Sequence, residues 1–254
     1  MKYDVVFFSP HLDDAILSAG GKMLDLIQQG KKVCVITVFT NFRSRYTSRA
    51  SQHHLQLSSE TRIRNFRRTR LLENLHACAL IRAECVHFNF FDGAFRTAPF
   101  TKNSFLYPDY KQIYGGKINC EDLNMLKQLK KLIHIFCIHK TKKTTHFFGP
   151  LGVGNHIDHL LVFTALLELQ IPYLSLWEDV PYHWDNEQTL SRVTDLTALY
   201  GPLHHTEINI SKYSQLKSKT IGCYKSQLAG LRSSGLTSLD LLTENFYKIK
   251  RNNI

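Results

Sequence analysis

The chain has 254 residues, a net charge of +11 at pH 7 and an ordinary 43% share of hydrophobic residues. This length allows one large domain with a sizeable core, expected to span residues 1–254. The N-terminus lacks the apolar stretch of a signal peptide, and no segment is apolar for long enough to cross a bilayer. We therefore expect neither secretion nor membrane insertion, and the expected location is the cytoplasm.

Short apolar runs alternate with longer helical patterns along the chain. In chain order, the sequence predicts strand 4–8, helix 14–29, strand 33–39, helix 60–80, strand 85–90, helix 121–139, strand 144–148, helix 156–170, strand 173–177, helix 188–199, strand 206–210 and helix 212–228. Several of these strands are apolar on both faces, which is typical of buried parallel strands. The alternation predicts a Rossmann-like, three-layer α/β fold with a mostly parallel central sheet.

Two connections are long, residues 40–59 and 91–119, and both follow a predicted strand. In an open α/β sheet, ligands bind outside the carboxyl ends of the strands. Long loops at that edge are more often functional than short ones. We therefore expect a site at this edge of the sheet.

The stretch SPHLDDAILSAGG, residues 9–21, follows the first strand and begins the first helix. It places His11, Asp13 and Asp14 at the carboxyl edge of the sheet. Two adjacent carboxylates repel each other unless a metal ion, a helix N-terminus or water compensates their charge. Helix capping is the simple alternative, but it accounts for only one carboxylate.

The stretch GPLGVGNHIDHLL, residues 149–161, repeats this arrangement after a later strand. His156 and His159 are three residues apart and share one face of the predicted helix. A His-x-x-His pair is weak evidence alone, because the 13 histidines of the chain would give roughly 0.7 such pairs by chance. Its position at a strand end strengthens it, because the carboxyl ends of parallel strands share one edge.

Three of these side chains suffice for a catalytic metal. His11, Asp14 and His159 would form a two-histidine, one-carboxylate set that suits zinc and also Fe(II). Asp13 could then take a proton from water at the metal, while His156 could donate a hydrogen bond to a developing oxyanion or protonate the leaving amine. Asp158 could orient His156, as carboxylates orient catalytic imidazoles.

The sequence resembles the PIG-L/LmbE-like zinc N-deacetylases. The resemblance rests on PHLDD at residues 10–14, the glycine pair at 20–21 and HIDH at residues 156–159. Further similarities are Arg70, Asp92 and WEDVPY at residues 177–182. Leu12 and Ala15 depart from the family pattern, which has proline and glutamate there, and the missing glutamate removes a carboxylate near the metal.

The resemblance implies a function and a role for each matching residue. Zn²⁺ would be held by His11, Asp14 and His159, with Asp13 as general base. His156 would stabilise the oxyanion with Asp158 behind it, and Arg70 and Asp92 would contact substrate. The implied reaction removes an acetyl group from an N-acetylglucosamine-type amine, in an amino-sugar conjugate.

Two other functions stay open at this point. Some family members resemble zinc hydratases of unsaturated acids, and the basic balance would suit an acidic substrate. A non-catalytic protein that binds nucleic acid or an anionic surface would rest on charge alone, and no nucleic-acid-binding signature supports it. The arginine-rich segment 62–70 suggests a phosphate or carboxylate on the substrate, although a solvated helix face is the simpler interpretation.

A few other polar residues have two interpretations. Glu178 and Asp179 follow a strand and could reach the site or be surface acids. His53 and His54 are expected as an exposed polar pair. Tyr182 and Trp184 could stack on a sugar ring, although core packing is the simpler interpretation.

Overall fold

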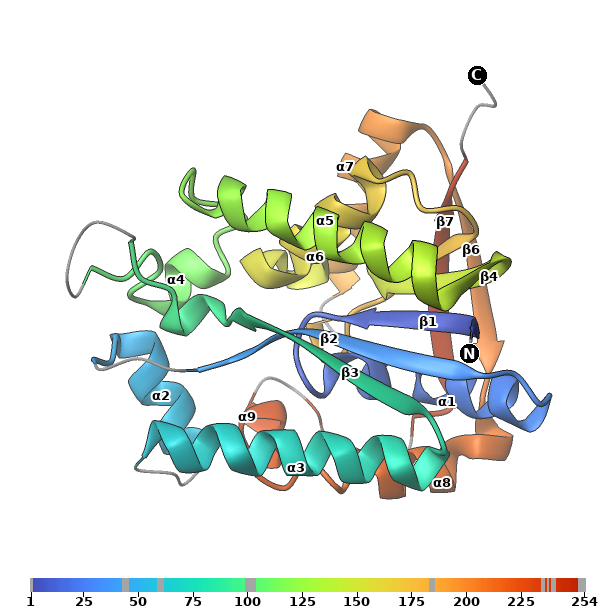
Figure 1. The fold of residues 1–254 in the computed structure, drawn as a ribbon, viewed down its shortest axis with the longest axis horizontal. Helices are drawn as coiled ribbons and strands as arrows, with labels where there is room; N and C mark the ends of the chain where they lie inside the picture. The colour runs from blue at the N-terminus through green and yellow to red at the C-terminus, as the bar shows by residue number, and fades with distance from the viewer. Residues whose placement is uncertain are drawn as a thin grey trace.

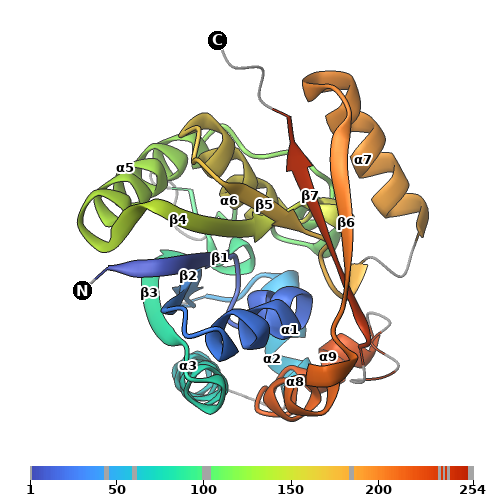
Figure 2. The same ribbon diagram turned by 90° about the vertical axis from the view of Figure 1, so that its right-hand side faces the viewer.

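The computed structural model describes residues 2–42, 46–58, 62–98, 104–182, 186–233, 236, 238 and 241–250. Its centre is a seven-stranded sheet in the order β3-β2-β1-β4-β5-β7-β6 (Figures 1 and 2). The strands are β1 Tyr3–Ser9, β2 Val33–Asn41, β3 Glu84–Phe91, β4 Thr141–Pro150, β5 Leu174–Trp177, β6 Leu203–Asn209 and β7 Thr243–Ile249. The first five pair in parallel, and β7 pairs antiparallel with both β5 and β6. This confirms the predicted α/β fold with a mostly parallel sheet.

Helices cover both faces of the sheet (Figure 1). The longer ones are α1 Asp14–Gln28, α3 Ile63–Ile81, α5 Asp122–Lys140, α6 Ile157–Glu168, α7 Asn186–Tyr200 and α8 Ser214–Ile221. Along β1, Val5 and Phe7 belong to the core under α1 and α3, whereas Val6 and Phe8 belong to the core under α5 and α6. Because successive side chains of a strand point to opposite faces, a strand buried on both sides must be apolar throughout.

The two long connections fold into a cap beyond the strand ends. They contain α2 Arg49–Leu57, the 3₁₀ turn Gly93–Phe95 and α4 Tyr110–Ile113. A separate apolar cluster holds this cap to the strand ends and includes Leu12, Phe42, Phe66, Phe95 and Ile157. Figure 1 shows α2 at the end of the molecule toward which the parallel strands point.

The C-terminal part departs most from the sequence prediction. The predicted helix 212–228 is a 3₁₀ turn followed by α8, a turn and the short α9 Leu228–Ser233. Strand β7 was not predicted, because its segment TENFYKI mixes polar and apolar side chains without alternation. Its polar Glu244 is buried for a reason that lies in α1, more than 200 residues earlier.

Helix α1 is kinked at Ala19, whose φ of −141° is not helical. The kink frees the backbone N–H groups of Gly21 and Lys22, which donate to the two carboxylate oxygens of Glu244 at 2.7 and 2.8 Å. The buried ammonium of Lys217 donates to the same carboxylate at 2.7 Å. A side chain at Gly21 would not fit, because its Cβ would lie 2.6 Å from Ile210.

Replacing Glu244 with glutamine is expected to lower the free energy of unfolding by about 3–5 kcal/mol, because it leaves the buried Lys217 ammonium without a counter-charge. Urea denaturation measures this difference. The control is Lys219→Met on α8, where the ammonium is exposed and the change should stay within about 0.5 kcal/mol. Equal stability of the two variants would contradict a role for the Lys217–Glu244 pair.

Candidate active site

The site begins in the tight turn between β1 and α1. The Ser9 hydroxyl donates to the carbonyl of His11 and accepts from the N–H of Ala15, at 2.5 and 3.0 Å. The N–H of His11 in turn donates to Asp14 Oδ2 at 2.7 Å. These contacts fix the His11 and Asp14 side chains at the carboxyl end of β1 before any ligand binds.

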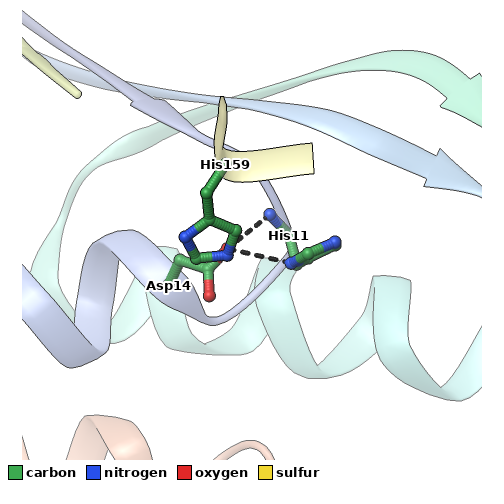
Figure 3. Close-up of side chains that lie close together, drawn as sticks. All are labelled: His11, Asp14 and His159. Carbon is green, nitrogen blue, oxygen red and sulfur yellow. Dashed lines mark hydrogen bonds and ion pairs between the residues drawn. The ribbon is translucent and has the colours of Figure 1, made fainter. Parts of the chain in front are cut away.

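His159 completes a three-residue cluster with His11 and Asp14 (Figure 3). Asp14 Oδ2 lies 3.1 Å from His11 Nδ1 and 3.3 Å from His159 Nε2. His159 is fully buried, yet its Nε2 makes no hydrogen bond among the described residues. Two nitrogens and one carboxylate oxygen, within 4.8 Å of one another, are suitable ligands for a divalent metal.

Each of the two imidazoles is held from behind by a carboxylate. His159 Nδ1 lies 2.8 Å from Asp179 Oδ1, and His11 Nε2 lies 3.1 Å from Asp158 Oδ2. This is the arrangement that orients metal-binding histidines and fixes their tautomers. It leaves His11 Nδ1 and His159 Nε2 as the nitrogens that face Asp14.

Buried carboxylates interact with both imidazoles of the cluster. Burial disfavours the imidazolium of His159, but the Asp14 and Asp179 carboxylates outweigh it and raise the pKa of His159 to about 9. Burial also opposes ionisation of Asp14, yet His159 and His11 hold the pKa of Asp14 well below its usual range. The cluster therefore favours a positive charge among its side chains, which protons or a metal cation can supply.

Asp179→Asn is expected to weaken metal binding about 10- to 100-fold, because the amide replaces the carboxylate behind His159. The metal dissociation constant, measured by competition with a chelator, tests this. Glu178→Gln is the matched control, since the neighbouring Glu178 accepts instead from Asn245. Unchanged metal affinity in the Asp179 variant would show that this carboxylate does not support a metal ligand.

The Asp158 carboxylate hydrogen-bonds His11 and not His156, the partner that the sequence suggested. The same carboxylate also contacts the N–H of Gly93 at 2.9 Å and the Arg96 guanidinium at 2.6 Å. Only the backbone N–H of Asp158 reaches His156, donating to Nδ1 at 3.1 Å. Helix geometry explains this, because His156 caps the N-terminus of α6 and so accepts from the first turn.

This cap defines the proton position on His156. An imidazole that accepts at Nδ1 carries its proton at Nε2 when it is neutral. Burial holds the pKa of His156 well below its usual range, so the neutral form prevails at pH 7. His156 therefore lines the pocket as a neutral imidazole with its proton on Nε2.

Asp13 and Arg70 lie on the pocket wall as a pair. Arg70 donates to Asp13 Oδ1 at 3.2 Å, and its guanidinium lies 5.3 and 5.5 Å from the Phe42 and Phe66 ring centroids. Burial raises the pKa of Asp13, an effect that Arg70 partly offsets. The carboxylate is thus oriented and suited to accept a proton.

A pocket of about 290 Å³ opens onto this site. Six of the eight residues expected at the site line it, and they are His11, Asp13, Asp14, Arg70, Asp92 and His156. Asp158 and His159 lie fully buried behind them. Asp92 accepts from the N–H of Ala94 with one oxygen, and the other lies 3.6 Å from His11 Nε2.

The rest of the pocket wall comes from the cap and the C-terminal segment. His53 and His54 line it, so they are more than the exposed polar pair expected from the sequence. Tyr182 also lines it, with its hydroxyl 3.2 Å from that of Tyr114, while Trp184 lies outside the described residues. The sequence did not point to Tyr114 or Arg96. A single tyrosine or arginine within a long predicted loop carries no motif that marks it as functional.

Comparison with known proteins places this geometry in a family. Residues 6–170, more than half of the chain, match the family described as PIG-L, GlcNAc-PI de-N-acetylase. The chain belongs to the PIG-L family. The match includes both strand-end motifs and ends at the turn after α6. The resemblance seen in the sequence is thereby confirmed, whereas no curated protein matches the sequence.

Solved structures share the fold of this PIG-L protein over nearly its whole length. The zinc-inhibited form of teicoplanin deacetylase Orf2 has a TM-score of 0.78 at 20% identity and covers 98% of each chain. The A40926 pseudoaglycone deacetylase Dbv21 has a TM-score of 0.70 at 21% identity, covering 99% of this chain and 98% of that one. GalB, the 4-carboxy-2-hydroxymuconate hydratase of Pseudomonas putida KT2440, has a TM-score of 0.57 at 15% identity and covers 100% and 99%. In the described part of the chain, no helix has the length and apolarity needed to span a membrane.

Proposed function

We propose that this protein is a zinc-dependent N-deacetylase that hydrolyses the acetamide of an amino sugar. The observation that carries the proposal is the cluster of His11, Asp14 and His159 on a pocket that also presents Asp13 and His156. Membership of the PIG-L family supports the same reaction. The teicoplanin and A40926 deacetylases, which share the fold, support a glycoconjugate as substrate.

The residues fit a metal ion. The buried Nε2 of His159 makes no hydrogen bond among the described residues, and both imidazoles are backed by carboxylates. His11, Asp14 and His159 would hold zinc, which as a Lewis acid would polarise the amide carbonyl and make water more acidic. Ligand type also suits Fe(II), so the choice of zinc rests on the family and its relatives.

The remaining steps belong to side chains of this chain. Water adds to the amide carbon while Asp13 takes its proton, a task that suits a carboxyl whose pKa is raised by burial. The Nε2 proton of His156 is hydrogen-bonded to the carbonyl oxygen as negative charge develops there. The C–N bond then breaks, Asp13 passes its proton to the amine nitrogen, and the acetic acid product leaves as acetate after its remaining proton passes to the amine or to water.

Arg70 and Asp92 have supporting roles in this reaction. Arg70 donates a 3.2 Å hydrogen bond to Asp13 and so orients this general base. Its main role is therefore to position Asp13, and contact with the substrate is secondary. Asp92 lines the pocket beside His11 and has an oxygen available to accept from a sugar hydroxyl.

The test is acetate release from N-acetylglucosamine and its glycosides, with zinc-loaded enzyme beside enzyme treated with a chelator. Release that disappears with the metal and returns on reloading is the expected result. Metal-loaded enzyme that releases no acetate but hydrates an unsaturated acid would establish the hydratase instead. Enzyme that binds no metal would exclude both reactions at this site.

A further inference from the structure

The charges around the pocket restrict what the amino sugar can be attached to. Among the described residues that line it, the carboxylates are Asp13, Asp14 and Asp92, and the only lysine or arginine is Arg70. Arg70 is already hydrogen-bonded to Asp13 and packed against two phenyl rings. The described wall therefore offers no uncommitted lysine or arginine to a phosphate or carboxylate on the substrate.

The other arginines of segment 62–70 add no cation to the described pocket wall. Arg62, Arg64 and Arg68 are exposed and do not line the pocket. Arg67 donates to the carbonyl of Thr40 and to the Asn89 side chain, at 3.3 and 3.2 Å. Apart from Arg70, the arginines of the segment that suggested an anionic substrate thus lie outside the pocket, mostly on a solvated helix face, which was the simpler interpretation of the sequence.

Beyond the metal cluster, the pocket wall combines aromatic and aliphatic side chains with the polar His53, Ser226, Gln227 and Ser233. Tyr110 and Tyr114 of the α4 segment stack at 5.8 Å between ring centroids, and His54 packs against Tyr110 at 5.5 Å. Burial lowers the pKa of His54 to about 4, so this imidazole is neutral at pH 7. Flat aromatic surfaces of this kind suit the apolar face of a sugar ring.

Leucines from α2 and α9 complete this part of the wall. Leu57 and Leu231 both line the pocket, together with the small residues Ser226, Gly230 and Ser233. The two helices approach closely, since a Cβ on Gly230 would lie 3.4 Å from Leu57 Cδ1. Helix α9 lies outside the matched family segment of residues 6–170, whereas α2 and the α4 segment lie within it.

We propose that the substrate is an amino sugar linked to an uncharged, apolar group that packs against Leu57 of α2 and Leu231 of α9, and not a sugar phosphate. This inference rests on the proposed deacetylase function. The acetamide meets the metal cluster, the sugar ring lies along Tyr110 and Tyr114, and the attached group contacts Leu57 and Leu231. Affinity then comes from apolar burial, and a phosphate against these leucines would lose its hydration with no described lysine or arginine free to compensate.

The test compares kcat/KM for acetate release from three compounds: N-acetylglucosamine, its hexyl β-glycoside and its 1-phosphate. The hexyl glycoside is expected to exceed the free sugar by about tenfold or more, because two buried methylene groups already correspond to about tenfold. The 1-phosphate is expected to fall below the free sugar. Equal or better turnover of the 1-phosphate would overturn the inference while leaving the deacetylase intact.

A charge placed on the wall provides the second measurement. Leu57→Lys is expected to lower the ratio of hexyl glycoside to 1-phosphate turnover at least tenfold, since a cation now faces the attached group. Leu75→Lys, at an exposed leucine of α3 outside the pocket, is the matched control and should keep the wild-type ratio. An unchanged ratio in Leu57→Lys would also overturn the inference. No acetate from any of the three compounds would count against the deacetylase function itself.

Discussion

Replacing Asp13 with asparagine is expected to lower kcat for acetate release about 10²- to 10⁴-fold while leaving the metal bound. The amide keeps the shape of the carboxylate and an oxygen that can accept from Arg70, which lies 3.2 Å from Asp13 Oδ1. It cannot take a proton from the attacking water. Because Asp13 is not in the cluster of His11, Asp14 and His159, metal content should not change.

Two measurements separate this prediction from simple misfolding. Bound metal and the thermal unfolding midpoint should match the wild type, while kcat falls and KM changes little. Asp25→Asn is the control, because Asp25 lies on the same helix and pairs with Lys22 at 3.0 Å far from the chemistry. An Asp13 variant with near wild-type kcat would require another general base.

Replacing His159 with alanine is expected to weaken metal binding more than about 100-fold, beyond the loss expected for a supporting carboxylate. The reason lies in its two nitrogens. Nε2 faces Asp14 without a hydrogen bond among the described residues, and Nδ1 is held by Asp179. The variant removes a proposed ligand and leaves the buried Asp179 carboxylate without its imidazole partner.

Chelator competition gives the dissociation constant, and thermal unfolding gives an independent measurement. Wild-type protein should be stabilised by added zinc, since a ligand that binds only the folded state raises its stability. The His159 variant should lose that response. His146→Ala, at an exposed histidine of β4, should keep it, and zinc stabilisation of both variants alike would place the metal elsewhere.

The half of the fold that surrounds the parallel strands could be predicted from the sequence, because the central strands β1 and β2 are buried on both faces and mainly apolar. Strands β3, β4 and β5 each contain a shorter apolar run. Strand β7 could not be predicted, because its stability depends on a distant partner. Glu244 is compatible with a buried strand only when Gly21, Lys22 and Lys217 surround it. Likewise α2 lies in a segment predicted as loop, where a distant apolar cluster stabilises its nine residues.

The part of the site that was predictable consists of metal-binding residue types that lie just after strand ends. His11, Asp14 and His159 each follow a strand end, and the parallel sheet brings strand ends together. The partner of Asp158 was not predictable, because a carboxylate on the first turn of α6 can turn toward His156 or toward His11. The direction of the Asp158 carboxylate depends on Gly93, whose N–H donates to it, and on Arg96, which forms an ion pair with it. The aromatic and leucine wall was missed for the same reason, since it joins three separate segments.

The kink of α1 also has a consequence for biosynthesis. Gly21 and the carboxylate that accepts its N–H are 223 residues apart in the chain. At about 5–20 residues per second on the ribosome, roughly 10–45 s pass between the two. The helix that carries Asp14 therefore emerges long before its acceptor does. Until then the freed N–H groups must be satisfied by water, so a nascent chain released early would hold both strand-end motifs but not a fixed α1.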